Sequence, residues 1–245
     1  GCVLSTHNIA ILNSISESLL LTTQIAVKKL FDIKSITTFD LVVIDEAQFL
    51  YEQMIDEGEL GEIVAFRTTN RGQNPGGWFI DEEQSGGGAV LDHTVHMVDI
   101  MRWYLGEEIT EVHAIVDSYF HTIDIDDAGI LTMEFENGVI ASHDASWSRF
   151  AEYPMWGDVT IEVIGTNRTV KADAFKEHFR LFTNEQKSLS HVFHGNDMDY
   201  GLIKDFVDCI EKKRDPTITG YDGLKALEVA LAAYTSSQER RTVRL

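Results

Sequence analysis

Apolar and polar residues alternate along most of the chain after residue 107, and turn sequences recur at short intervals. Asn137-Gly138 separates two of these alternating runs and is a strong hairpin signal, and Gly165-Thr166-Asn167 marks a further turn. Strands that follow one another through tight turns pair in the antiparallel direction. This half of the chain therefore predicts a large antiparallel sheet. The expected strands are residues 110–120, 128–135, 139–148, 159–165, 169–173 and 179–183.

Apolar residues at helical spacing mark the segments on either side of this sheet. A helix that begins with a capping box is expected over residues 13–31, and a short apolar strand over residues 39–45. A second helix is expected to end near Gly58. Two further helices, with apolar faces over residues 203–210 and 224–234, follow the strands.

This order of elements predicts an α+β fold. We expect a large, open, mostly antiparallel sheet with helices on one face, preceded by a partial α/β, Rossmann-like segment. Residues 1–60 are interpreted as the remnant of a Rossmann-type α/β domain, and residues 61–245 as one α+β domain for substrate binding and oligomerisation. The Gly- and Asn-rich residues 67–84 are expected to form a long loop, and loops of this kind often cover a site.

Ionisable side chains recur along one line of a helix that is otherwise apolar, in the stretch SGGGAVLDHTVHMVDIMRW (residues 85–103). The helix is expected to run to Leu105 and to stop at Gly106. Asp92 and His96 are four residues apart, so their side chains share one face. A carboxylate beside an imidazole would select one tautomer and favour its charged form, as proton transfer requires. Asp92 and His96 are therefore candidate catalytic residues.

Two other interpretations of this helix remain open at the level of residue types. Asp92 could cap the helix with His96 as its structural partner, because ion pairs within a fold also shift pKa values. A metal site built from Asp92, His93, His96 and Asp99 is disfavoured. His93 projects about 100° away from Asp92 around the helix, so no single face presents three ligands.

Composition excludes several classes of partner. The chain has 20 Lys and Arg against 40 Asp and Glu, a formal net charge of −20, so it would repel nucleic acid and anionic membranes. No apolar run approaches the about 18 residues of a membrane span. The two cysteines form no disulfide framework, which fits a reducing cytosol and predicts a cytoplasmic protein without a metal site of its own.

The glycine-led helix also carries a resemblance to a known family. Residues 54–63, Trp78, residues 85–106 and residues 220–237 together resemble the glucose–fructose oxidoreductase and inositol dehydrogenase (Gfo/Idh/MocA) family. The resemblance implies a Rossmann domain followed by an α+β domain with an open antiparallel sheet. It also implies hydride transfer between a sugar or polyol carbon and NAD or NADP, and a homo-oligomer formed through the sheet.

The resemblance assigns roles to particular residues. Asp92 and His96 fall on the family's Asp and His, which would orient the substrate hydroxyl and move its proton. Residues 2–10 align with the segment that carries the family's Glu-Lys-Pro, which places His7 on the catalytic lysine; His7 is alternatively an ordinary residue near a frayed terminus. Trp78 and His93 are candidate substrate-binding residues, with a core position as the alternative for Trp78.

The cofactor half implied by the family is largely missing from the sequence. No Gly-x-Gly-x-x-Gly is present, so binding of NAD or NADP by this chain alone is not expected. The leading hypothesis is a sugar or polyol oxidoreductase whose cofactor half lies mostly elsewhere. The second hypothesis is a non-catalytic sugar-binding or oligomerisation module derived from that family.

Overall fold

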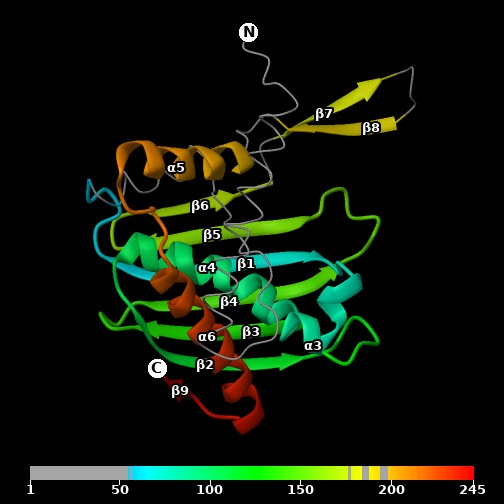
Figure 1. Cartoon of the computed structure of the whole chain (residues 1–245), viewed down its shortest axis with the longest axis horizontal. Helices are drawn as coiled ribbons and strands as arrows, with labels where there is room; N and C mark the ends of the chain where they lie inside the picture. Colours follow the sequence, from blue (N-terminus) through cyan, green and yellow to red (C-terminus); the bar gives the residue numbers. More distant parts are fainter. Residues whose placement is uncertain (1–54, 56, 176–177, 184–187, 194–197) are drawn as a thin grey trace.

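A seven-stranded mixed sheet is the frame of the molecule in the computed structural model, which describes residues 55, 57–175, 178–183, 188–193 and 198–245 (Figure 1). The strand order is β6-β5-β1-β4-β3-β2-β9. The strands are β1 (Ile63–Gln73), β2 (Ile109–Asp117), β3 (Ala128–Phe135), β4 (Ile140–Arg149), β5 (Gly157–Gly165), β6 (Thr169–Asp173) and β9 (Val243–Arg244). Among these strands only β1 and β4 pair in parallel, and every other described pairing in the sheet is antiparallel.

Helices cover one face of this sheet. α4 (Ala89–Leu105) and α6 (Gly220–Glu239) cross the sheet in contact with each other (Figure 1). The short η1 (Gly77–Ile80) and α3 (Glu82–Ser85) precede α4. α5 (Met198–Lys212) and a separate hairpin, β7 (His178–Thr183) with β8 (Ser188–Phe193), are the other described elements. The predicted α+β sheet with helices on one face is confirmed, while the expected preceding α/β segment lies outside the described residues, apart from its last few positions.

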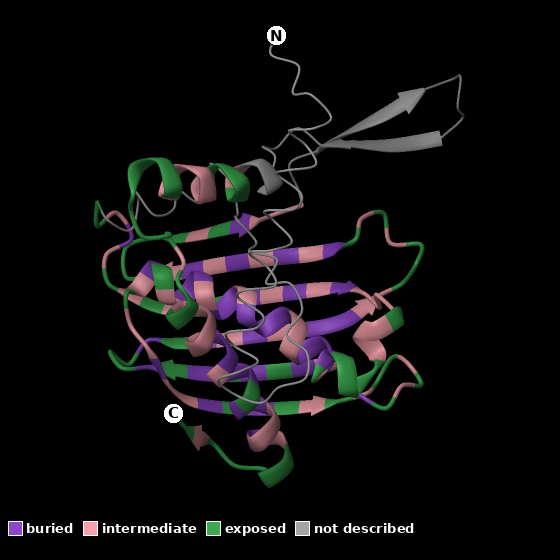
Figure 2. Ribbon diagram, in the orientation of Figure 1, coloured by how far each residue is buried: buried purple, intermediate pink, exposed green. Residues whose placement is uncertain are grey.

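The core lies between the sheet and the two long helices, because alternate residues of each strand point towards them (Figure 2). On β3, for example, Leu131 and Met133 are buried while Ile130 points to the opposite face and is 54% exposed. Met97 and Met101 of α4 are fully buried against this layer. The alternation seen in the sequence thus records a sheet that is covered on one side only.

The central strand β1 was wrongly predicted as a loop from Arg67 onwards. Its inward positions are Phe66, Thr68, Asn70 and Gly72, so only one of them is a large apolar residue. A strand whose buried side chains are mostly polar shows no alternation of apolar and polar residues in the sequence. The structure satisfies the buried polar groups instead: the Thr68 hydroxyl lies 2.8 Å from Nδ1 of His143, and the Asn70 amide donates to the carbonyl of His93.

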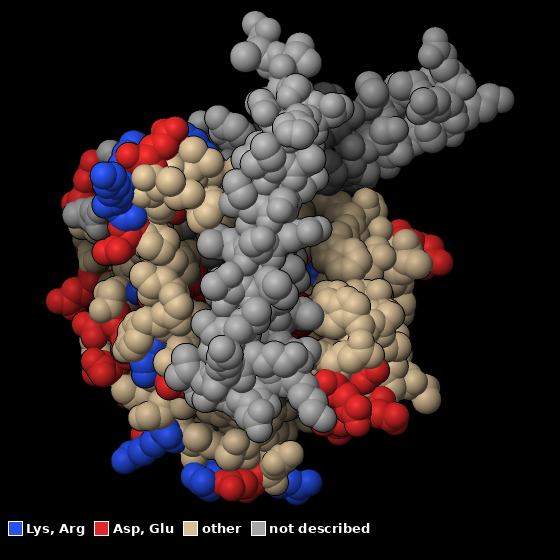
Figure 3. Space-filling view, viewed as in Figure 1, with Lys and Arg blue, Asp and Glu red and all other residues tan. Residues whose placement is uncertain are grey.

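Charge is unevenly distributed over the surface. Acidic side chains gather at the left margin and at the lower right of the face that carries the helices, and basic ones lie mainly along its lower edge and near α5 (Figure 3). Within the described residues, no helix has both the length and the apolar character needed to span a membrane.

Candidate active site

The N-terminus of α4 is held by a carboxylate from another part of the chain. Asp126 accepts hydrogen bonds from the backbone amides of Gly88 and Val90 (2.9 and 2.8 Å), and the hydroxyl of Tyr234 donates to the same carboxylate at 2.7 Å. A Cβ on Gly88 would lie 1.8 Å from the backbone oxygen of Asp126. Because Gly88 has no side chain, the loop segment that carries Asp126 can approach the start of α4 this closely. Asp126, and not Asp92, caps the helix, which excludes that alternative role for Asp92.

Asp92 is bound to protein through one of its two oxygens. The indole N–H of Trp147 donates to Oδ2 at 3.1 Å, and Nε2 of His93 lies 3.2 Å from the same oxygen. The Nδ1–H of His93 donates to the backbone carbonyl of Asn70 at 2.7 Å, which fixes the orientation of the ring. No described residue hydrogen-bonds Oδ1, and the side chain of Asp92 is 28% exposed. Oδ1 is therefore available to a ligand.

The surroundings of Asp92 keep it ionised. Burial alone would raise the pKa of this carboxyl group, but the hydrogen bond and charge of His93 oppose that effect. The Trp147 N–H and the charge of His96 act in the same direction as His93, and the pKa of Asp92 is lowered overall. A carboxylate acceptor is thus present at neutral pH.

His96 differs from its prediction in two ways. The imidazole that pairs with Asp92 is that of His93, the adjacent residue, and no described residue hydrogen-bonds the His96 ring. Burial lowers the pKa of His96 to about 4, against the charge of Asp92, which raises it. The expectation that the charged form is favoured is therefore wrong, because desolvation outweighs the attraction of one carboxylate. At neutral pH His96 is an uncharged imidazole that can accept a proton.

Two residues of β4, His143 and Trp147, complete the polar layer beneath α4. Trp147 is fully buried and binds Asp92, and His143 is 1% exposed with Nδ1 held by Thr68. Burial lowers the pKa of His143 to about 3, so it is uncharged. The period-two spacing of these two residues was visible in the sequence, but which face they occupy was not.

Comparisons with known proteins identify the family of the chain. Residues 51–171 match the family model described as the GFO/IDH/MocA C-terminal domain. Myo-inositol 2-dehydrogenase of Thermotoga maritima is 29% identical over 205 residues, which are 79% of this chain and 59% of that protein. 1,5-anhydro-D-fructose reductase of Ensifer adhaerens is 31% identical over 188 residues, 73% of this chain and 54% of that protein. The chain belongs to the Gfo/Idh/MocA family.

A solved member of the Gfo/Idh/MocA family shows the same fold. GenD2 from gentamicin A biosynthesis, whose crystal structure is a complex with NAD, superimposes with a TM-score of 0.73 at 27% identity. The match covers 84% of this chain and 62% of GenD2. The chain thus spans about 60% or less of the length of these relatives.

Most of the described residues fall within the match to the C-terminal domain of the Gfo/Idh/MocA family. The described residues contain no strand, glycine-rich turn and helix in the order that a dinucleotide site requires, so they do not fit NAD or NADP by themselves. In the same part of the chain no group of three or more His, Cys, Asp or Glu side chains could hold a metal ion.

The remaining residues singled out by the Gfo/Idh/MocA resemblance are only partly placed. Trp78 lies on η1, half-buried, and stacks on Phe79 with ring centroids 3.7 Å apart. Phe79 in turn packs against the cluster around Trp147, so Trp78 lies one ring away from the partner of Asp92. His7 lies outside the described residues.

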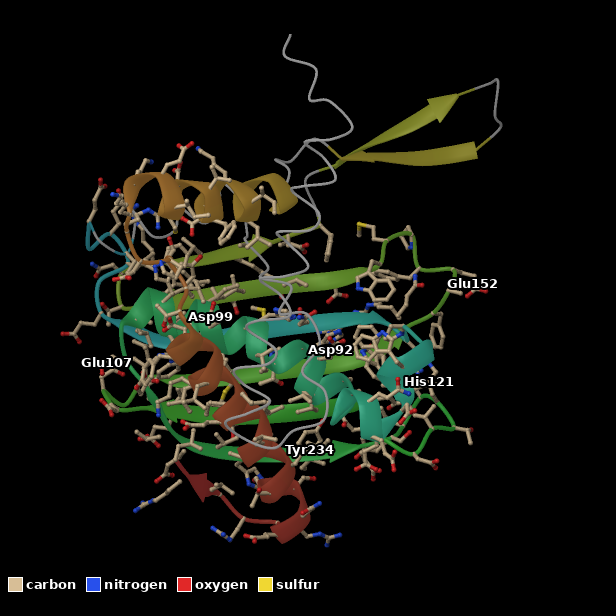
Figure 4. The ribbon with its side chains drawn as sticks, in the orientation of Figure 1. Asp92, Asp99, Glu107, His121, Glu152 and Tyr234 are labelled. Atoms are coloured by element: carbon tan, nitrogen blue, oxygen red, sulfur yellow. The ribbon has the colours of Figure 1, made fainter. Side chains whose placement is uncertain are left out.

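A second ionisable group lies further along α4, on the other half of the helix (Figure 4). Burial raises the pKa of Asp99 to about 6, the charge of Asp222 raises it as well, and Arg102 opposes them. Because this pKa lies above the ordinary value of 3.8, the stability linked to Asp99 is complete below pH 3.8 and is lost as the pH rises through 6.

Asp99→Asn is therefore expected to stabilise the protein at pH 7 and to leave its stability at pH 4 nearly unchanged. The gain at pH 7 should be about 1–2 kcal/mol, less than the full pKa shift implies, because the group is partly exposed. Urea unfolding at both pH values measures the difference. Equal effects of the substitution at pH 4 and pH 7 would contradict the raised pKa.

Proposed function

We propose that this chain provides the substrate side of an oxidoreductase that transfers a hydride between a sugar or polyol carbon and NAD or NADP. One observation carries the proposal: an ionised, partly exposed Asp92 lies beside an uncharged, poorly solvated His96 on the same helix. Oxidation of an alcohol needs an acceptor that orients the hydroxyl group and a base that takes its proton.

The two residues would divide these tasks. Oδ1 of Asp92 accepts the hydrogen bond of a substrate hydroxyl group next to the reacting one and so orients the substrate, while Oδ2 stays bound to Trp147 and His93. The neutral imidazole of His96 takes the hydroxyl proton as the carbon is oxidised, and returns it in the reverse direction. When bound, a nicotinamide supplies the hydride acceptor for this reaction.

Further assignments belong to the same proposal. His93, with its side chain only 6% exposed, would support Asp92 more than it touches substrate, and Trp78 would bound the substrate. His7 would take the place of the family's lysine. Residues 1–60 would be the remnant of the Rossmann-type domain and residues 61–245 the substrate domain. NAD or NADP would then be bound mainly by protein other than the described residues.

A homo-oligomer formed through the open face of the sheet is also part of the proposal. Ile115 and Ile130 are paired across β2 and β3 and are 61% and 54% exposed, and Ile140 on β4 is 56% exposed. Arg67 and Glu162 form an ion pair on the same face. Apolar side chains framed by charges are typical of surfaces that associate.

The experiment is polyol-dependent reduction of NAD, followed by the absorbance of NADH, with myo-inositol as the first substrate. We expect His96→Gln to lower turnover by about 10²–10⁴-fold, the usual contribution of a general base, and Asp92→Asn to weaken substrate binding by about tenfold or more. His113→Gln, on an exposed position of β2, is the matched control. Turnover that survives His96→Gln unchanged would remove this residue from the mechanism.

A non-catalytic sugar-binding module is the second candidate. The absence of Gly-x-Gly-x-x-Gly, and His7 in place of the family's lysine, favour it. Titration with NADH and NADPH, followed by nicotinamide fluorescence, separates the two functions. Because the described residues are not expected to bind a dinucleotide by themselves, the titration uses the chain together with a Rossmann domain of the family. Polyol binding that depends on Asp92, without dinucleotide binding or turnover in that assembly, would establish the module instead of the enzyme.

A further inference from the structure

Gly72, at the end of β1, lies where two polar ring edges meet. A Cβ placed on Gly72 would lie 3.4 Å from Nε1 of Trp156 and 3.5 Å from Nε2 of His93. The same Nε2 is 3.2 Å from Oδ2 of Asp92. Nε1 of Trp156 therefore lies close to the Asp92–His93 pair, beside the bare backbone of Gly72.

The backbone around Trp156 is fixed although its side chain is exposed. The backbone amide of Gln73 donates to the carbonyl of Trp156 at 3.1 Å, and the side-chain amide of Gln73 donates to the carbonyl of Met155 at 3.2 Å. The next residue, Gly157, lies so close to β1 that a Cβ there would be 2.0 Å from the oxygen of Arg71. Trp156 nevertheless remains 53% exposed.

The N–H of Trp156 is a donor without a partner in the described part of the chain, whereas that of Trp147 is used by Asp92. Because the side chain of Trp156 is 53% exposed, a ligand can reach this N–H. Figure 4 shows that the loop carrying Glu152, which also carries Trp156, leaves the sheet at the end of α4 where Asp92 lies. An unpaired donor thus lies at Gly72, next to the His93 ring that binds Asp92.

We propose that Trp156 and Gly72 determine specificity for a diol: one hydroxyl group of the substrate donates to Oδ1 of Asp92, and a neighbouring hydroxyl group accepts from the indole N–H of Trp156. This inference rests on the proposed function, because it uses Asp92 as the ligand acceptor. A hydroxyl group both donates and accepts, so a polyol matches a donor and an acceptor held a short distance apart. A monohydric alcohol satisfies only one of them.

Gly72 leaves room for such a ligand. Its φ lies outside the left-handed region, so an alanine is compatible with its backbone. The added methyl group would occupy the point between His93 and Trp156, at distances of 3.3–3.5 Å from their ring atoms. Gly72→Ala therefore fills the space between the two rings, and its 3.3 Å approach to Cε1 of His93 requires that ring to give by a few tenths of an ångström.

The test is the dissociation constant of myo-inositol, and of 1,5-anhydro-D-fructose as a second probe, measured by calorimetry on the protein with NAD present. Trp156→Phe keeps an aromatic ring at this position and removes the indole N–H. We expect this variant to bind myo-inositol about three- to tenfold more weakly, which corresponds to the loss of one hydrogen bond. Gly72→Ala is expected to weaken binding to a similar extent. Trp103→Phe is the matched control, because Trp103 is 37% exposed on α4 and lies about 16 Å along the helix from Asp92.

The indole N–H resonances in NMR spectra distinguish a direct contact between Trp156 and the ligand from a change in the structure of the variant. Each tryptophan has its own indole N–H resonance, and that of Trp156 should shift on addition of myo-inositol while that of Trp103 stays in place. Binding that is unchanged in Trp156→Phe but lost in Asp92→Asn would overturn the diol inference and leave the proposed function standing. Binding that is unchanged in Asp92→Asn, or absent from the wild-type protein, would overturn both. A change of oligomeric state in Trp156→Phe, seen by gel filtration, would assign the indole to a subunit interface instead.

Discussion

Gly88→Ala is expected to destabilise the protein by about 3 kcal/mol or more, because the added methyl group would overlap a backbone atom. The new Cβ would lie 1.8 Å from the backbone oxygen of Asp126 and 2.7 Å from its Oδ1. Because the nearest atom belongs to the backbone, it cannot rotate away. The displaced segment would also withdraw the carboxylate that caps α4, so Asp92 would lose its position together with the stability.

Thermal and urea unfolding measure this prediction, with Gly220→Ala as the control. A Cβ on Gly220, at the start of α6, meets nothing within 4 Å and its φ is compatible with alanine. That substitution is expected to be neutral or to stabilise by up to about 1 kcal/mol. A similar unfolding free energy for the two variants would show that the close approach of Gly88 to Asp126 carries no energetic weight.

Arg102→Met is expected to cost about 3 kcal/mol at neutral pH, because it leaves carboxylates without their cation. Arg102 has a side chain that is 9% exposed, binds Glu108 through two nitrogens at 2.7 and 2.8 Å, and reaches Asp222 of α6 at 3.2 Å. It thereby joins the end of α4 to the start of β2 and to the first turn of α6. Methionine retains the apolar stem and removes only the charge.

The loss of stability caused by Arg102→Met is expected to depend on pH. The hydrogen bond from Arg102 lowers the pKa of Glu108 below its ordinary 4.5, so the stability it contributes is present above pH 4.5 and is lost as the pH falls through the lowered pKa. The difference between wild type and Arg102→Met should therefore shrink on acidification. Lys212→Met, whose exposed side chain pairs with Asp208, should change stability by less than about 0.5 kcal/mol. A constant difference from pH 7 to pH 3 would contradict the ion-pair account.

Both substitutions act on α4, one at each end of the helix. Asp126 fixes the first turn of α4 and Arg102 its last turn, and Asp92 and His96 lie between them. A proton-transfer pair needs side chains held to within a fraction of an ångström, and a helix fixed at both ends provides that. The hydrogen bonds of Asp92 to Trp147 and His93 then fix its rotamer.

The local elements were largely determined by the sequence itself. α4 ends at Leu105 with Gly106 in the left-handed conformation, as its glycine predicted, and strands β3 and β6 have the predicted bounds. These elements are readable because their apolar period matches their geometry over several turns or residues. β1 was missed because its inward side chains are mostly polar, and β8 was missed as well.

Which residues meet at the site was decided only by the tertiary structure. The positions of Asp92 and His96 on one helix follow from their spacing, and that part of the candidate site was visible in the chain. The partners of Asp92 depend on Trp147 and, through His93, on Asn70, and both residues approach from distant strands. Burial by the surrounding chain sets the protonation state of His96. Desolvation and hydrogen bonding act over a few ångströms in space and leave no periodic trace along the chain, so a sequence pattern cannot report them.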